Sequence, residues 1–94
     1  MRPFSDSKTV GTATVIFDIP NPPKNYLFIQ NTHAVNTIYY NLDEKVVNKA
    51  TTSNIEIRPK ASHTFGKDDL EKLELKNINV ISSGAGSIVK VSCL

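Results

Sequence analysis

The sequence predicts a small all-β fold, namely an antiparallel, jelly-roll-like β-sandwich of about six to eight short strands. The last 17 residues alternate apolar and polar side chains on both sides of a turn that contains Gly84 and Gly86. Similar short runs recur along the chain, and Pro, Gly and Asn separate them. At most one helical turn is expected, near residues 68–73. Frequent short strands with frequent breaks are typical of sandwiches and small barrels.

The first residues predict an arm followed by one domain. Residues 1–11 are polar and end at Gly11, so we expect an N-terminal arm outside a single β-sandwich domain that spans residues 12–94. Residues 12–19 alternate in polarity, which predicts a half-buried strand. Three prolines within residues 20–23 end this strand, because proline cannot donate to a strand ladder.

The middle of the chain predicts two more strands and an unassigned segment. Residues 24–32 begin apolar on both faces, which indicates a central strand covered on both sides. Residues 37–42 alternate, and the short connection 33–36 predicts that these two strands form a hairpin. Residues 43–53 allow either a long loop or a loop that holds a short edge strand at Val46 and Val47.

Two short strands and one helical turn follow. The strands are expected at residues 54–58 and 63–65, on either side of a turn that contains Pro59. Residues 66–73 allow one helical turn that Asp68 would cap, with Leu70 and Leu73 facing inward.

Residues 78–94 predict a closing β-hairpin with a two-residue or a four-residue turn. Both turns give the same register, in which Val80 faces Val89 and Ile78 faces Val91. We expect these four side chains in the core, with Cys93 on the same face. The opposite face would carry Ile81 and Ile88 beside Asn79 and Lys90.

Composition argues against several classes of partner. The net charge is +2, and the 11 basic residues are scattered rather than clustered, which argues against nucleic-acid binding. No apolar run reaches the roughly 18 residues of a membrane helix, so no membrane partner is expected. Cys93 is the only cysteine, so it cannot form an internal disulfide, and we expect a buried thiol rather than a reactive one.

The sequence offers no set of catalytic or metal-ligating residues. His33 and His63 lack metal-ligand spacing, and we expect both on the surface. The carboxylate pairs Asp43-Glu44 and Asp68-Asp69 lack the ligand periodicity of a calcium loop. No serine lies in a strand–elbow–helix motif that would activate it as a nucleophile. We therefore expect a protein that is not an enzyme and that uses no metal or cofactor.

Four large side chains interrupt otherwise polar faces and are candidates for a subunit interface. They are Ile16, Tyr39, Ile81 and Ile88. The alternative, which the sequence leaves open, is that residues 43–53 or the N-terminal arm cover some of them. The exposed edge strands of an open sandwich also favour assembly.

Four segments taken in order resemble one family. They are Tyr26–Thr32 (YLFIQNT), Thr37–Asp43 (TIYYNLD), Ser53–Pro59 (SNIEIRP) and Ile78–Gly86 (INVISSGAG), followed by a closing Val-Lys-Val strand. This order resembles the small β-sandwich accessory proteins of tailed bacteriophages over residues 24–94. Residues 1–23 and 66–76 depart from the family pattern.

The resemblance implies a structural role in the virion, such as a capsid decoration or cement protein or a head-fibre-associated protein. It implies a protein made in the host cytoplasm and placed in the virion. The implied partners are further copies of the chain, as a homo-oligomer, and a major capsid or other virion protein. The polar N-terminal arm would then serve as a tether. The alternative function is a module that binds carbohydrate or a host surface, in which Tyr26, Tyr39 and Tyr40 would stack on sugars.

Overall fold

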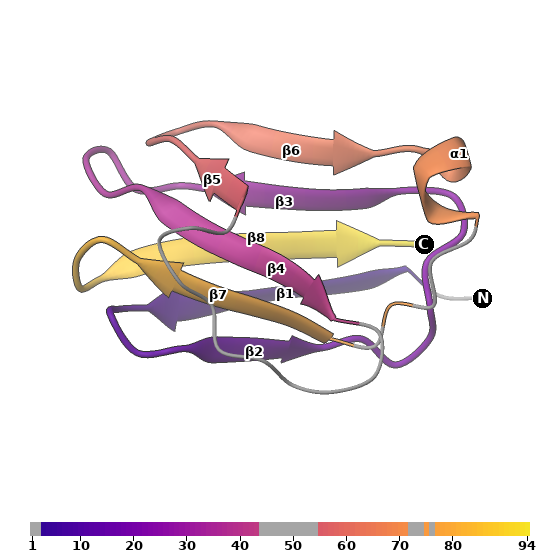
Figure 1. Ribbon diagram of the computed structural model, residues 1–94, viewed down its shortest axis with the longest axis horizontal. Helices are drawn as coiled ribbons and strands as arrows, with labels where there is room; N and C mark the ends of the chain where they lie inside the picture. The colour runs from indigo at the N-terminus through magenta and orange to yellow at the C-terminus, as the bar shows by residue number, and fades with distance from the viewer. Residues whose placement is uncertain (1–2, 44–54, 72–74, 76) are drawn as a thin grey trace.

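Two four-stranded antiparallel sheets pack face to face in the computed structural model, which describes residues 3–43, 55–71, 75 and 77–94 (Figure 1). One sheet has the strand order β1 (Phe4–Val10), β8 (Ser87–Cys93), β3 (Leu27–Asn31) and β6 (Ser62–Phe65). The other has the order β2 (Val15–Asp18), β7 (Asn77–Ser82), β4 (Ile38–Asp43) and β5 (Ile55–Ile57). We call them the β1-β8-β3-β6 sheet and the β2-β7-β4-β5 sheet. One short helix, α1 (Lys67–Leu70), follows β6.

The strand order is that of a jelly roll, so the predicted fold class is confirmed. β1 pairs with β8, β2 with β7, β3 with β6 and β4 with β5, all antiparallel. Partners therefore lie symmetrically about the middle of the chain, as if one long hairpin had been rolled into two sheets. Consecutive strands lie in opposite sheets, except β4 and β5, which pair with each other in one sheet.

Both predicted hairpins are wrong in the same way. β7 and β8 lie in opposite sheets, and so do β3 and β4. Val80 pairs with Val15 and Tyr40 rather than with Val89. The inward faces were nevertheless correct, because a connection that crosses between sheets turns the same alternate residues toward the core as a hairpin would. Ser82 and Ser87, which would pair across a hairpin, instead meet across the core with their Oγ atoms 2.7 Å apart.

The N-terminal segment is also not an arm. Residues 4–10 form β1, which pairs with β8 at seven consecutive positions. Its exposed side chains are Ser5, Ser7 and Thr9, while Phe4 packs against the core and Val10 is buried. The backbone ladder with β8 and the apolar side chains of Phe4 and Val10 hold β1 in place, so this strand forms without a continuous apolar sequence.

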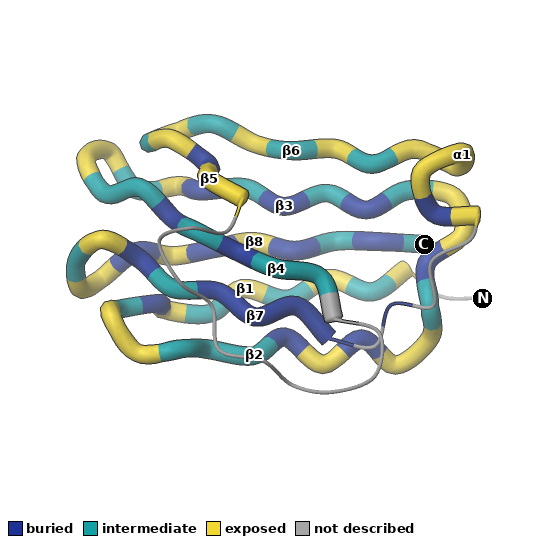
Figure 2. The backbone as a smooth tube through the Cα atoms, in the orientation of Figure 1, coloured by how far each residue is buried: buried dark blue, intermediate teal, exposed yellow. Residues whose placement is uncertain are grey.

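The core lies between the sheets and includes residues from nearly every strand (Figure 2). Its largest fully buried side chains include Phe17, Leu27, Ile29, Tyr40 and Ile78. The helix adds Leu70, as predicted. Gly66, not Asp68, occupies the N-cap, and the Asp69 carboxylate accepts the Gly66 N–H at 3.1 Å. The predicted strand at Val46 and Val47, and the inward position of Leu73, fall outside the described residues.

The connections 11–14, 32–37, 58–61 and 83–86 all lie at one end of the sandwich, on the left in Figure 1. We call this the connection end. At the opposite end, α1 and the C-terminus lie near each other, and the Leu94 carbonyl accepts backbone N–H groups from Lys24, Asn25 and Tyr26. The sandwich therefore offers two outer faces and two distinct ends for contact with other molecules.

Candidate functional site

The four candidate interface residues do not form one patch. Ile16, Tyr39 and Ile81 lie on the outer face of the β2-β7-β4-β5 sheet, where Tyr39 is directly opposite Ile81. Ile88 lies on the outer face of the other sheet. The predicted Ile81–Ile88 pair is wrong because β7 and β8 belong to different sheets. Ile88 is 46% exposed, whereas the other three are half-buried.

The outer face of the β1-β8-β3-β6 sheet is rich in small hydroxyl side chains. They are Ser5, Ser7, Thr9, Thr32, Ser62, Thr64 and Ser92. Phe28, Lys90 and Ile88 interrupt them on the two central strands, β3 and β8, with Ile88 near the end of β8 that follows the 83–86 connection. We call this surface the hydroxyl face. A shallow depression of about 340 Å³ lies on it beside β1 and is lined by Ser5, Asp6, Ser7 and Lys90.

The other outer face carries a row of asparagines beside its three apolar residues. Asn79 is fully buried, and its Nδ2 donates to Asn41 Oδ1 at 2.9 Å and to Asn77 Oδ1 at 3.3 Å. Asn79 Oδ1 has no hydrogen-bond partner among the described residues. Sequence analysis placed Asn79 beside Ile81 but gave no reason to expect a buried amide there.

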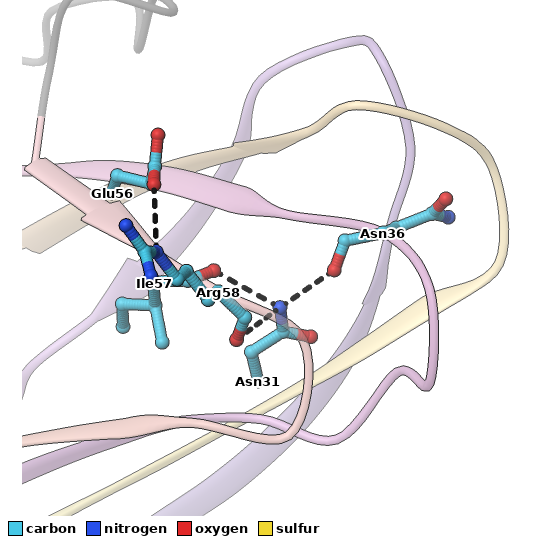
Figure 3. Close-up of polar contacts among 5 residues, drawn as sticks. All are labelled: Asn31, Asn36, Glu56, Ile57 and Arg58. Carbon is cyan, nitrogen blue, oxygen red and sulfur yellow. Dashed lines mark hydrogen bonds and ion pairs between the residues drawn. The ribbon is translucent and has the colours of Figure 1, made fainter.

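A single buried asparagine joins two loops at the connection end (Figure 3). Asn31 Nδ2 donates to the carbonyls of Asn36 at 2.8 Å and of Ile57 and Arg58, each at 3.1 Å. Its Oδ1 accepts the N–H of His33 at 3.1 Å. Two N–H groups therefore serve three carbonyls, so one hydrogen is shared. Asn31 ties the β3–β4 connection to the β5–β6 connection.

Asn36 extends this arrangement to the β7–β8 connection. Its Nδ2 donates to the Ala85 carbonyl at 3.2 Å and to Ser87 Oγ at 3.1 Å. A Cβ added at Gly84 would lie 3.0 Å from Asn36 Oδ1, so only glycine fits here without a shift of that amide. Three of the four connections at this end are thus held by asparagine side chains.

Both histidines are half-buried, and each is held by hydrogen bonds within the chain. His33 Nδ1 accepts the N–H groups of Val35 at 3.0 Å and Asn36 at 2.8 Å. His63 Nδ1 lies 2.9 Å from the Tyr40 hydroxyl, and the two rings meet edge to face. Burial raises the pKa of Tyr40 to about 12. The Tyr40–His63 hydrogen bond joins the two sheets.

The chemistry of the described residues is that of a packed scaffold. Cys93 is buried as predicted, and burial raises the pKa of its thiol. Among the described residues, no three His, Cys, Asp or Glu side chains cluster as a metal ion would require. Within the same part of the chain, no helix is long and apolar enough to cross a membrane.

The three tyrosines of the carbohydrate alternative do not share a surface. Tyr40 is buried, Tyr39 lies on the outer face of the β2-β7-β4-β5 sheet, and Tyr26 is half-buried in the β2–β3 connection. A sugar ring could therefore stack on at most one of them at a time.

No model of a known protein family matches the chain, and no curated protein matches it. One solved structure with a similar fold is a chain from Bacillus endospore appendages, described as a novel family of disulfide-linked pili. The TM-score is 0.50 at 11% sequence identity, over 98% of this chain and 84% of that chain. This likeness supports the all-β sandwich fold alone.

Proposed function

We propose that this chain is a non-enzymatic structural protein of a bacteriophage virion, most simply a capsid decoration, cement or head-fibre-associated protein. It would act through contacts with other copies of itself and with a major capsid or other virion protein. The segments that resemble phage accessory proteins give the proposal its biological setting. Jelly rolls are also a common architecture of viral capsid domains.

The observation that carries the proposal is the hydroxyl face. It presents short, uncharged side chains around Ile88, and Lys90 is the only charged residue among its outward positions on the described strands. Short side chains lose little conformational entropy when a partner covers them. An exposed apolar residue on a central strand of such a face is a candidate for an energetic hot spot.

Peptide mass spectrometry of density-gradient-purified virions of the encoding phage tests the location. We expect peptides of this chain in a fixed ratio to the major capsid protein. Their absence from the particles, with the protein present in the infected-cell lysate, would refute a role in the virion.

Binding of the purified protein to particles that lack it tests the surface. We expect Ile88→Lys to weaken co-sedimentation by about tenfold, since a charge replaces an exposed apolar contact. Val35→Lys adds the same charge at a residue that is 74% exposed at the connection end, and it should leave binding unchanged. Deleting residues 1–11 is unsuitable as a test because it would remove β1.

A further inference from the structure

The open edges of the two sheets differ in how they are protected. Among the described strands, β1 and β6 border one sheet and β2 and β5 border the other. An edge strand exposes unpaired N–H and C=O groups that can pair with another chain. Soluble proteins usually protect such edges with charged side chains, with proline or with very short strands.

Charged side chains close the edge of β1. The ladder with β8 leaves the N–H of Ser7 on the open side, and the Asp6 carboxylate accepts it at 2.9 Å. Lys8 lies at an inward position, with its Nζ 5.8 Å from the centre of the Phe17 ring. A strand added to this edge would displace Asp6 and bury its charge.

The two edges of the other sheet carry charge and are bounded by proline. β2 has four residues, ends at the exposed Asp18 and is followed by Pro20. β5 has three residues and carries Glu56, which lies 3.7 Å from the Arg58 guanidinium. Pro59 follows directly. Neither edge can extend its ladder far.

β6 is as short as β2, but its sequence, Ser-His-Thr-Phe, contains neither a charged side chain of the Asp, Glu, Lys or Arg type nor a proline. Asn31 N–H donates to the Ala61 carbonyl at 3.0 Å, which places the bonding groups of residues 61, 63 and 65 toward β3. The N–H and C=O groups of Ser62 and Thr64 therefore point to the open side. No ribbon lies beyond β6 in Figure 1. The Tyr40–His63 hydrogen bond fixes the strand to the opposite sheet.

We infer that β6 pairs with β6 of a second copy, antiparallel and across a two-fold axis at His63, so that two β1-β8-β3-β6 sheets become one sheet of eight strands. In this register Ser62 of one copy and Thr64 of the other exchange two backbone hydrogen bonds, and the symmetry repeats them. The inference deepens the proposed function, since it names the self-contact that the proposal requires.

Charge selects a second copy as the occupant. A two-fold axis between antiparallel strands places each side chain beside residues of its own strand, so a strand with one sign of charge, such as β2 with Asp18 or β5 with Glu56, brings like charges together. Of the four edges, only the β6 strand carries no Asp, Glu, Lys or Arg. The paired sheet would also join two hydroxyl faces into one continuous surface. A pairing this short is weak alone and gains strength when many copies are arrayed on one particle.

Sedimentation of the full chain over rising concentration tests the pairing. We expect the mass to rise from 10.4 kDa toward twice that value as the concentration approaches about 1 mM. Thr64→Pro removes an N–H on the open side, where edge strands tolerate proline, and should hold the protein at the monomer mass. Thr9→Pro makes the matching change on the β1 edge and should leave the mass change intact. Thr64→Ala keeps the backbone N–H and should also still dimerise.

A monomer at every concentration, or a Thr64→Pro protein that still doubles its mass, would overturn the inference. Should Thr64→Pro fail to fold by circular dichroism, amide exchange of the unaltered chain decides. The Ser62 and Thr64 amides should exchange at least about tenfold more slowly in the concentrated sample than in the dilute one. If the mass doubles while the exchange rates of the Ser62 and Thr64 amides stay the same, the contact between the two copies does not lie at β6, and the inference is wrong. Virion mass spectrometry is independent of these results, so either proposal can fail alone.

Discussion

Two buried asparagines, Asn31 and Asn79, occupy opposite kinds of site. Both side chains are fully buried, yet Asn31 uses both its amide nitrogen and its oxygen, while the oxygen of Asn79 has no partner in the part of the chain that the structure describes. Asn31 bonds carbonyls of residues 26 and 27 positions away in sequence, and Asn79 bonds asparagine side chains on its own sheet. The comparison suggests different roles: the Asn31 amide holds two connections together, whereas the Asn79 amide bonds only side chains of its own sheet.

The difference follows from what each amide satisfies. Asn31 supplies donors to the backbone carbonyls of Asn36, Ile57 and Arg58 at the connection end, and an unpaired buried carbonyl carries the full desolvation cost. Asn79 lies within a strand whose backbone is already paired on both sides. The Asn79 amide therefore bonds side chains only, and burial of its Oδ1 carries a desolvation cost that no described hydrogen bond offsets.

Replacing Asn31 should have the largest effect of the substitutions considered. Asn31→Leu keeps the branched shape but removes the donor to three carbonyls and the acceptor of the His33 N–H. Of these carbonyls, that of Arg58 keeps the Ala61 N–H as a partner. We expect a loss of about 3 kcal/mol in the free energy of unfolding, measured by urea denaturation. Asn21→Leu, at an exposed position, is the control and should change it by less than about 0.5 kcal/mol. Equal losses at both positions would remove the special role of Asn31.

Gly84→Ala tests whether the connection end is held as one unit. The new Cβ would lie 3.0 Å from Asn36 Oδ1, so the amide must rotate away from Ala85 and Ser87. We expect a loss of about 1–2 kcal/mol by thermal or urea unfolding. Gly11→Ala places its Cβ 3.9 Å from the Ala85 Cα, an ordinary contact, and should cost at most about 0.5 kcal/mol. A Gly84→Ala protein as stable as Gly11→Ala would show that Asn36 moves without penalty.

The sequence predicted where the strands lie better than it predicted which strands pair with each other. The β4, β5 and β6 runs and the inward side chains of β7 and β8 could be found because alternation marks the buried face. Alternation cannot say whether two consecutive strands pair or cross between sheets, since both arrangements bury the same residues. Ser82 and Ser87 show this directly, because they face each other in either arrangement.

The local sequence pattern could not predict the hydrogen bonds of Asn31, the strand β1 or the Tyr40–His63 contact, because their partners are distant in sequence. In sequence, Asn31 is the middle residue of a Gln-Asn-Thr run that is typical of any strand terminus. Its partners become neighbours only when the jelly roll closes. β1 was missed because Ser5, Ser7 and Thr9 resemble a disordered arm until β8 is placed beside them. The Tyr40–His63 contact leaves a weak signal, an inward-facing tyrosine whose hydroxyl needs a partner.

Tyr40→Phe should have a smaller effect that depends on pH. Loss of one buried hydrogen bond to His63 is expected to cost about 1 kcal/mol near neutral pH. The pKa of Tyr40 is raised from 10.0 to about 12 in the folded protein. The unfolded chain therefore loses its proton first, and the contribution of Tyr40 declines as the pH rises through this interval.

The measurement is urea unfolding of both proteins between pH 8 and pH 11.5, compared at each pH. The stability of the unaltered chain should fall more steeply with pH above 10 than that of Tyr40→Phe, so that the two curves converge or cross. Parallel curves would show that the Tyr40 hydroxyl titrates equally in the folded and unfolded states. Tyr39→Phe controls for the general loss of a phenol, because its ring lies on an outer face.

Asn79→Leu should have the smallest effect, although the residue is as buried as Asn31. The substitution removes two hydrogen bonds, but the oxygen without a partner goes with them, and leucine buries apolar surface instead. The acceptors left behind belong to Asn41 and Asn77, neither of which is fully buried. We therefore expect a change of less than about 1 kcal/mol in the free energy of unfolding. A loss equal to that of Asn31→Leu would mean that the outer asparagine row fixes the fold as strongly as the connection end does.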